Sequence, residues 1–224
     1  MNRRLIVVIS AVIMAMAVTS GCNIVTPIAY IIEGPGTIDA EYELADVPTV
    51  VFVDDRANIL SPIMLRRNIA DTVSKELMTR AGLSTTIRPQ DALTVAKRLD
   101  TNEEPISMDR IARGVGAEQI VYVQMRSWKR TPDGFTPRPT ASCTVQVLDV
   151  VEGRQAYPIG EDGQPIIEGR SVVAMLPAMN ESAFESRAAI RQLQELLAQQ
   201  TGTEIAKLFY RHERVDLGGN LQSR

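Results

Sequence analysis

The feature that most constrains this fold is a short, uninterrupted apolar run early in the chain. Val50 to Val53 follow Pro48 and end at the acidic pair Asp54-Asp55. A strand that is apolar on both faces must be covered on both sides, as central strands are in sheets that carry helices. The run therefore predicts a buried central strand in a domain of mixed α and β structure.

Further strands and helices follow this run in an alternating order. Helices are expected from Ser61 to Gly82, with Pro62 in the first turn, and from Pro89 and Ser107 over shorter lengths. Strands are expected over 83–88, 120–125, 142–148 and 171–176, with a hairpin turn at Glu152-Gly153. Asn180 or Ser182 should cap a long final helix that Gly202 interrupts. The order β-α-β-α-α-β-β-(β)-β-α predicts an α/β (α+β) fold with a single mixed β-sheet and helices packed on it.

The first residues of the chain have the pattern of a secretion signal. Arg3 and Arg4 precede an apolar stretch from Leu5 to Val18, and the small residues Thr-Ser-Gly then lead to Cys22. The stretch is too short to span a bilayer comfortably. Its end resembles the lipobox of bacterial lipoproteins, in which the cysteine is acylated and the chain is cut just before it. By that resemblance Cys22 carries lipid and anchors the protein to a membrane.

The resulting domain plan has four parts. Residues 1–21 are the signal peptide, 22–46 a lipidated tether, 47–213 an α/β periplasmic domain and 214–224 a flexible tail. Without Arg3 and Arg4, 22 basic residues remain against 27 acidic ones, a net charge of −5. An acidic chain without a basic patch gives no support to nucleic-acid binding.

Residues for catalysis are scarce. The chain has one histidine, His212, and beyond Cys22 one cysteine, Cys143, so neither a Cys-His nucleophile pair nor a Cys/His zinc site is expected. Cys143 fits a buried strand position, and His212 fits a solvated helix end. We expect no enzyme activity, no cofactor and no resident metal.

Two groups of residues are candidates for a functional site. Asp54 and Asp55 end a buried strand, where α/β sheets often bind ligands, and their carboxylates suit a hard cation. They also suit a purely structural role, as acceptors for the N–H groups of the following loop. Trp128 and Phe135 flank a loop that contains cations, where they would contact a partner protein or glycan, or cap the sheet.

The order of elements resembles one group of envelope proteins. The relevant segments are "VVFVDD", "SPIMLRRNIADTVSKELMTRAG", "STTIRPQDALTVAKRL", "MDRIARGVGAEQIVYVQM" and "ASCTVQVLDVVEGRQAY". They are similar to the periplasmic domain shared by the curli-secretion channel lipoprotein, the amino-terminal domain of the Tol-system β-propeller protein and the lipoprotein activators of peptidoglycan synthases. The resemblance implies a non-catalytic domain that works through protein contacts.

The sequence thus favours a lipid-anchored accessory or scaffold protein in envelope assembly or transport. Asn23, which follows the lipidation site, favours the outer membrane, facing the periplasm, by resemblance to Gram-negative lipoproteins. The partner would be another envelope protein, and a homo-oligomer is compatible with this role. Two alternatives stay open, namely a small-ligand or divalent-cation binder or enzyme at Asp54-Asp55, and a subunit of an oligomeric secretion complex.

Overall fold

The computed structural model describes residues 36–99 and 107–214, which fall into two compact units. The described part of the smaller unit is an antiparallel pair of β1 (Thr37–Ile38) and β8 (His212–Glu213). His212 therefore lies in a short strand and not at the end of a helix, as its sequence position had indicated. The larger unit runs from Asp39 to Arg211 and contains all the other elements.

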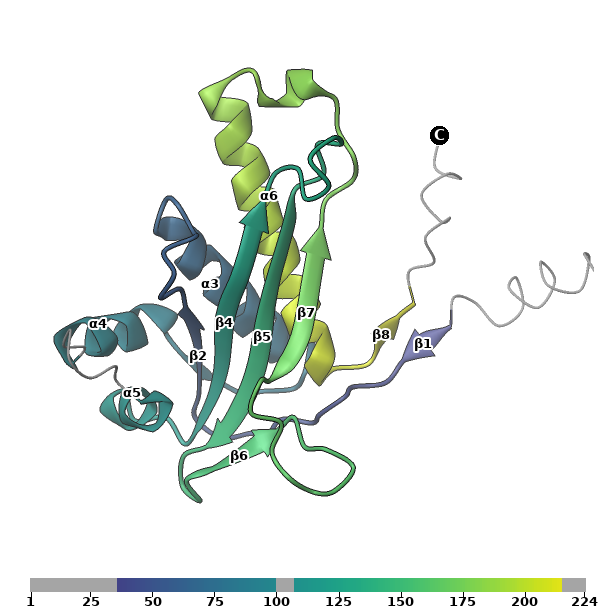
Figure 1. Ribbon diagram of the computed structural model, residues 1–224. Coiled ribbons are helices and arrows are strands. Elements are labelled where there is room, and N and C mark those ends of the chain that lie inside the picture. Colours follow the sequence, from purple (N-terminus) through teal and green to yellow (C-terminus); the bar gives the residue numbers. More distant parts are fainter. Residues whose placement is uncertain (1–35, 100–106, 215–224) are drawn as a thin grey trace, which may run out of the picture. The chain divides into compact units, whose positions relative to one another are not determined.

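A six-stranded mixed sheet forms the centre of the larger unit (Figure 1). Its strands are β2 (Thr49–Asp54), β3 (Thr86–Ile87), β4 (Gln119–Lys129), β5 (Thr140–Asp149), β6 (Arg154–Tyr157) and β7 (Arg170–Met175). Strand β2 is parallel to β3 and β4, while β4, β6 and β7 are antiparallel to β5. The predicted single mixed sheet is confirmed.

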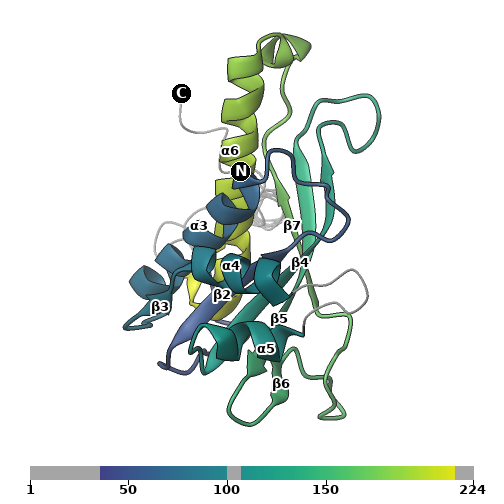
Figure 2. The ribbon, with the colours of Figure 1, turned by 90° about the vertical axis from the view of Figure 1, so that its left-hand side faces the viewer.

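Helices pack on both faces of this sheet (Figures 1 and 2). They are α3 (Met64–Arg80), α4 (Pro89–Leu99), α5 (Met108–Gly114) and α6 (Arg187–Ala206), with short 3-10 turns η1 (Glu181–Phe184) and η2 (Lys207–Phe209). Their order along the chain agrees with the predicted order. None of the described helices combines the length and the apolar character needed to cross a membrane.

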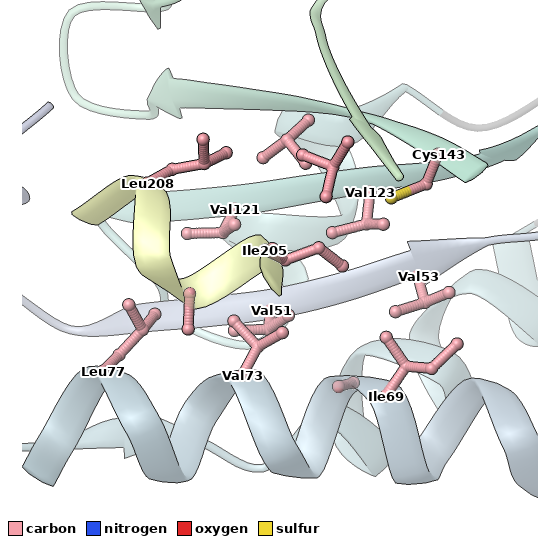
Figure 3. Close-up of a cluster of buried hydrophobic side chains, with 14 of the residues drawn as sticks. Val51, Val53, Ile69, Val73, Leu77, Val121, Val123, Cys143, Ile205 and Leu208 are labelled. Atoms are coloured by element: carbon pink, nitrogen blue, oxygen red, sulfur yellow. The ribbon is translucent and has the colours of Figure 1, made fainter. Parts of the chain in front are cut away.

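The central strand β2 contributes to two hydrophobic clusters, because successive strand residues point to opposite faces. Val51 and Val53 pack with α3 and α6, and Figure 3 shows the apolar stripe of α3 directed toward them. Val50 and Phe52 pack with α4 and α5 on the other face. The fully apolar run thus has the two-sided cover that its composition predicted.

Two predicted helix starts were wrong. Helix α3 begins at Met64 and not at Ser61. Residues 62–65 first form a turn, in which the carbonyl of Pro62 accepts a hydrogen bond from the N–H of Leu65. Helix α6 begins at Arg187, where the Ser186 side chain accepts the N–H of Ala189.

The predicted end of α3 and the predicted cap of α5 are both confirmed. Gly82 follows α3 with a φ of +81°, a backbone conformation that favours glycine after a helix. Ser107 caps α5 by accepting the N–H of Arg110.

Residues 39–46, which the sequence assigned to the tether, belong to the larger compact unit. The Tyr42 ring stacks on Tyr157 at 5.4 Å between centroids, and Leu44 packs against the core. Glu41 binds Arg170 through both carboxylate oxygens at 2.7 Å. This segment is therefore fixed to the strands that follow it much later in the chain.

Candidate functional site

The acidic pair lies at the carboxyl end of β2, with each carboxylate in a different environment. Both are almost fully buried, since the side chain of Asp54 is 8% exposed and that of Asp55 is 1% exposed. The Asp55 carboxylate accepts the backbone N–H groups of Ile59 and Leu60, both at 2.9 Å. Asp55 therefore holds the loop between β2 and α3, which is the structural role considered from the sequence.

Asp54 points to the face of the sheet that α4 and α5 cover. The Tyr122 hydroxyl on β4 donates a hydrogen bond to its carboxylate, and Arg56 Nε lies 2.9 Å from the same oxygen. Burial, together with the neighbouring carboxylate, raises the pKa of Tyr122 above its ordinary value of 10.0. Tyr122 therefore remains a neutral donor at physiological pH, and the charge of Asp54 is balanced by Arg56.

These contacts leave the two carboxylates with separate roles. No group of three or more His, Cys, Asp or Glu side chains suited to a metal ion occurs within residues 36–99 and 107–214. Ca²⁺ takes six to eight oxygen ligands, whereas Mg²⁺ is held by one or two carboxylates and keeps several waters. Asp54 and Asp55 are engaged by Arg56, Tyr122 and backbone N–H groups, and the divalent-cation alternative stays a prediction from the sequence.

A cavity of about 410 Å³, the α3–α4 cavity, opens beside this pair. It lies between the start of α3, helix α4, the carboxyl end of β2 and Tyr122 on β4. Four cations contribute to its wall: Arg56, Arg66, Arg67 and Lys97. Apolar side chains form much of the remainder, among them Phe52, Leu93 and Ile111. The sequence indicated the acids and the adjacent Arg56 but not Arg66, Arg67 and Lys97, because these three lie on helices whose approach to the acids depends on packing.

The second candidate pair, Trp128 and Phe135, is divided between two environments. Trp128 is half-buried against the core and lines a cavity of about 200 Å³ beside α6. Phe135, in the loop between β4 and β5, is 90% exposed. The Asp133 carboxylate accepts the N–H groups of Phe135 and Thr136 at 3.0 and 2.9 Å, which orders this turn. Trp128 thus packs against the core, and partner contact by the exposed Phe135 stays a prediction.

Of the two cysteines, only Cys143 lies among the described residues. Cys143 is fully buried on β5, as its alternation with polar residues predicted, and burial raises the pKa of its thiol to about 12. Cys22 lies outside the described residues, so its acylation remains a prediction from the sequence.

No protein-family model matches the chain, and no curated protein matches its sequence. Solved structures give distant matches. A PelC dodecamer from Paraburkholderia phytofirmans is 13% identical, with 79% of this chain and 97% of that one covered and a TM-score of 0.40. The hypothetical protein CT253 from Chlamydia trachomatis is 17% identical, with 72% and 93% covered and a TM-score of 0.42.

A lipoprotein is also among these structures. GNA1162 from Neisseria meningitidis is 12% identical, with 68% of this chain and 91% of that one covered and a TM-score of 0.34. Similarity at these scores assigns neither a family nor a function. The resemblance to the curli channel, Tol-system and synthase-activator group stays a prediction.

Proposed function

We propose that this protein is a lipid-anchored accessory protein of the bacterial cell envelope, held at the outer membrane and acting through protein contacts without catalysis. The observation that carries the proposal is the apolar stretch that ends in Thr-Ser-Gly-Cys at Cys22. The scarcity of nucleophile and metal-ligand sets in the sequence supports a non-enzymatic role. The anchor determines where the protein acts, and the folded domain would provide the contact surface.

Phe135 is the residue that we assign to partner contact. A large aromatic side chain that is 90% exposed gains much by desolvation in an interface, where aromatic residues commonly dominate affinity. Its turn is ordered by Asp133, so little conformational entropy is lost when a partner binds.

The anchor is tested by replacing each cysteine separately. Cys22→Ser should abolish the incorporation of radiolabelled fatty acid and release the protein from the membrane fraction. Cys143→Ala, which removes the other thiol, should leave both unchanged. Labelling that persists in the Cys22→Ser protein, or a protein that stays with the membrane, would refute the anchor. Density fractionation of envelopes then distinguishes the outer from the inner membrane.

The contact surface is tested by affinity capture from envelopes, followed by mass spectrometry. Phe135→Ala should lose one or more specific partners that the wild-type protein captures. Ile167→Ala is the matched control, since this exposed aliphatic side chain, 82% accessible, lies on a different loop. Equal partner sets for both variants would argue against Phe135.

Self-association is compatible with the scaffold role and is required by the secretion-subunit alternative, because such a subunit acts as an assembly of copies. Sedimentation velocity of the detergent-solubilised protein measures it directly. A strictly monomeric profile over the accessible concentration range would remove the secretion-subunit alternative. A discrete, concentration-independent oligomer would favour it.

A further inference from the structure

We propose that the α3–α4 cavity binds a small organic anion, in which a phosphate or carboxylate group is attached to an apolar body. The inference is independent of the lipid anchor and of Phe135. The acidic pair alone suggested a cation as the ligand, whereas the complete lining of the cavity favours an anion.

The charge of the cavity wall favours an anion. Four cations line it against two carboxylates, Asp54 and Asp55, which are already engaged by Arg56, Tyr122 and the backbone of the following loop. Arg67 pairs with Asp71 at 3.2 Å, but this pair is exposed and therefore screened by water. The lining keeps an excess of positive charge for a ligand.

Arg66 and Lys97 are the two cations whose capacity for hydrogen bonds or ion pairs is not fully used by the described residues. The Arg66 side chain is 20% exposed, and its buried Nε–H has no hydrogen-bond acceptor among the described residues. Its nearest carboxylate oxygen, on Asp55, is 4.0 Å away, which exceeds hydrogen-bond length. Lys97, exposed on α4, forms no ion pair within the described part of the chain. An anion in the cavity would supply the missing acceptor.

The start of α3 adds to this potential. The helix has 17 residues, begins at Met64 in the cavity wall, and has neither a side-chain cap nor an acidic residue in its first turn. The partial positive charge at a helix N-terminus stabilises a nearby anion. This contribution acts in the same direction as that of the four cations.

The apolar part of the wall defines the rest of the ligand. Phe52 and Ile111 belong to the hydrophobic cluster beneath the cavity, and Met64 and Leu93 line its sides. A volume of about 410 Å³ is within the range of small-molecule sites. An inorganic ion alone would leave these side chains hydrated, so an anion with an aromatic or aliphatic body fits better.

The experiment is isothermal titration of the full-length protein in non-ionic detergent with four probes: phenyl phosphate, benzoate, inorganic phosphate and benzylamine. We expect saturable one-to-one binding of phenyl phosphate or benzoate, at least about tenfold tighter than that of inorganic phosphate, and no binding of benzylamine. Comparison of phenyl phosphate with benzoate identifies the preferred anionic group. No saturable binding by either organic anion, or equal binding of benzylamine, would overturn the proposal.

Two variants on α4 distinguish binding in the cavity from attraction by the general surface charge. Lys97→Gln should weaken binding of the preferred probe about tenfold, whereas Arg98→Gln, the neighbouring exposed cation outside the cavity wall, should change it less than about twofold. Arg66→Gln should also weaken binding, and Arg66→Lys should restore part of it. Because Lys97 is exposed and forms no ion pair within residues 36–99 and 107–214, equal affinities for Lys97→Gln and Arg98→Gln would count decisively against the site.

Discussion

At the scale of single residues, Cys143 shows how a strand position determines chemical reactivity. Its side chain is fully buried on β5, and burial raises the thiol pKa to about 12. The thiolate, which is the reactive form, is therefore scarce at neutral pH and out of reach of reagents.

The Cys143 prediction concerns alkylation. In the Cys22→Ser protein, iodoacetamide at about pH 8 should leave Cys143 unlabelled in the native state and label it fully after denaturation. Mass spectrometry of the intact protein measures the modification. Stoichiometric labelling of the native protein would contradict the buried placement.

Glu41 gives a second prediction at this scale, on the pH dependence of stability. Hydrogen bonds from Arg170, and a further one from the Tyr157 hydroxyl at 2.7 Å, lower the pKa of Glu41 below 4.5. The folded state therefore binds this proton less tightly than the unfolded state. The stabilisation is complete above about pH 5 and is lost as the pH falls through the lowered pKa of the folded state.

The Glu41→Gln variant tests this dependence. Since the Glu41–Arg170 pair is half-exposed, we expect the free energy of unfolding near neutral pH to fall by about 0.5–1 kcal/mol. Urea titrations should show this difference shrinking toward about pH 3. Glu43→Gln is the control, because Glu43 is exposed and forms no ion pair in the described chain. A difference from wild type that stays constant down to acid pH would assign the effect to packing and not to charge.

At the scale of elements, the contact between α3 and α6 depends on Gly202. The sequence predicted that this glycine interrupts the last helix, but α6 continues through it to Ala206. A Cβ at this position would lie 2.6 Å from the Thr72 Cβ and 2.9 Å from the Ile69 carbonyl oxygen. Gly202 therefore allows the two helices to approach closely.

The Gly202→Ala variant measures the importance of this approach. Alanine favours an isolated helix by about 1 kcal/mol over glycine, but the clash with α3 should exceed that gain. We expect a net loss of about 1–3 kcal/mol in the free energy of unfolding. Thr203→Ala, one residue along the same helix, should change stability by less than about 0.5 kcal/mol. A more stable Gly202→Ala protein would mean that the helices are further apart than described.

At the scale of the whole Asp39–Arg211 unit, the two hydrophobic clusters share strands. Alternate residues of β2 and β4 belong to one cluster or the other, so neither cluster can be lost without disrupting the common sheet. The unit should therefore unfold in one cooperative step.

Urea unfolding tests this cooperativity with two probes. The fluorescence of Trp128, the only tryptophan in the chain, reports on one cluster, and far-UV circular dichroism reports on all elements. The two transitions should coincide in wild type, and also in Val50→Ala and Val51→Ala, each shifted by about 2 kcal/mol. Separate transitions, or a shift in only one probe, would show that the two faces unfold independently.

Much of the fold follows from local pattern. The apolar run at Val50 to Val53 indicates a two-sided strand, and the four-residue spacing of Leu65, Ile69, Val73 and Leu77 indicates one buried helix face, as observed. The pattern did not reveal that β6 and β7 both pair with β5, because strand partners depend on contacts distant in sequence. It likewise placed the start of α6 too early, since a serine caps a helix only where the chain turns into it.

The features of the candidate sites likewise divide into those encoded locally and those that depend on tertiary packing. The sequence by itself determined the Cys22 motif and the buried position of Cys143, and it offered the loop-holding role that the structure assigns to Asp55, because each depends on neighbouring residues alone. Only the tertiary structure decided that Arg66 and Lys97 line the same cavity as Asp54. The reason is physical: strand and helix periodicity is encoded within a few residues, whereas the charge of a cavity depends on which distant segments are brought together by packing.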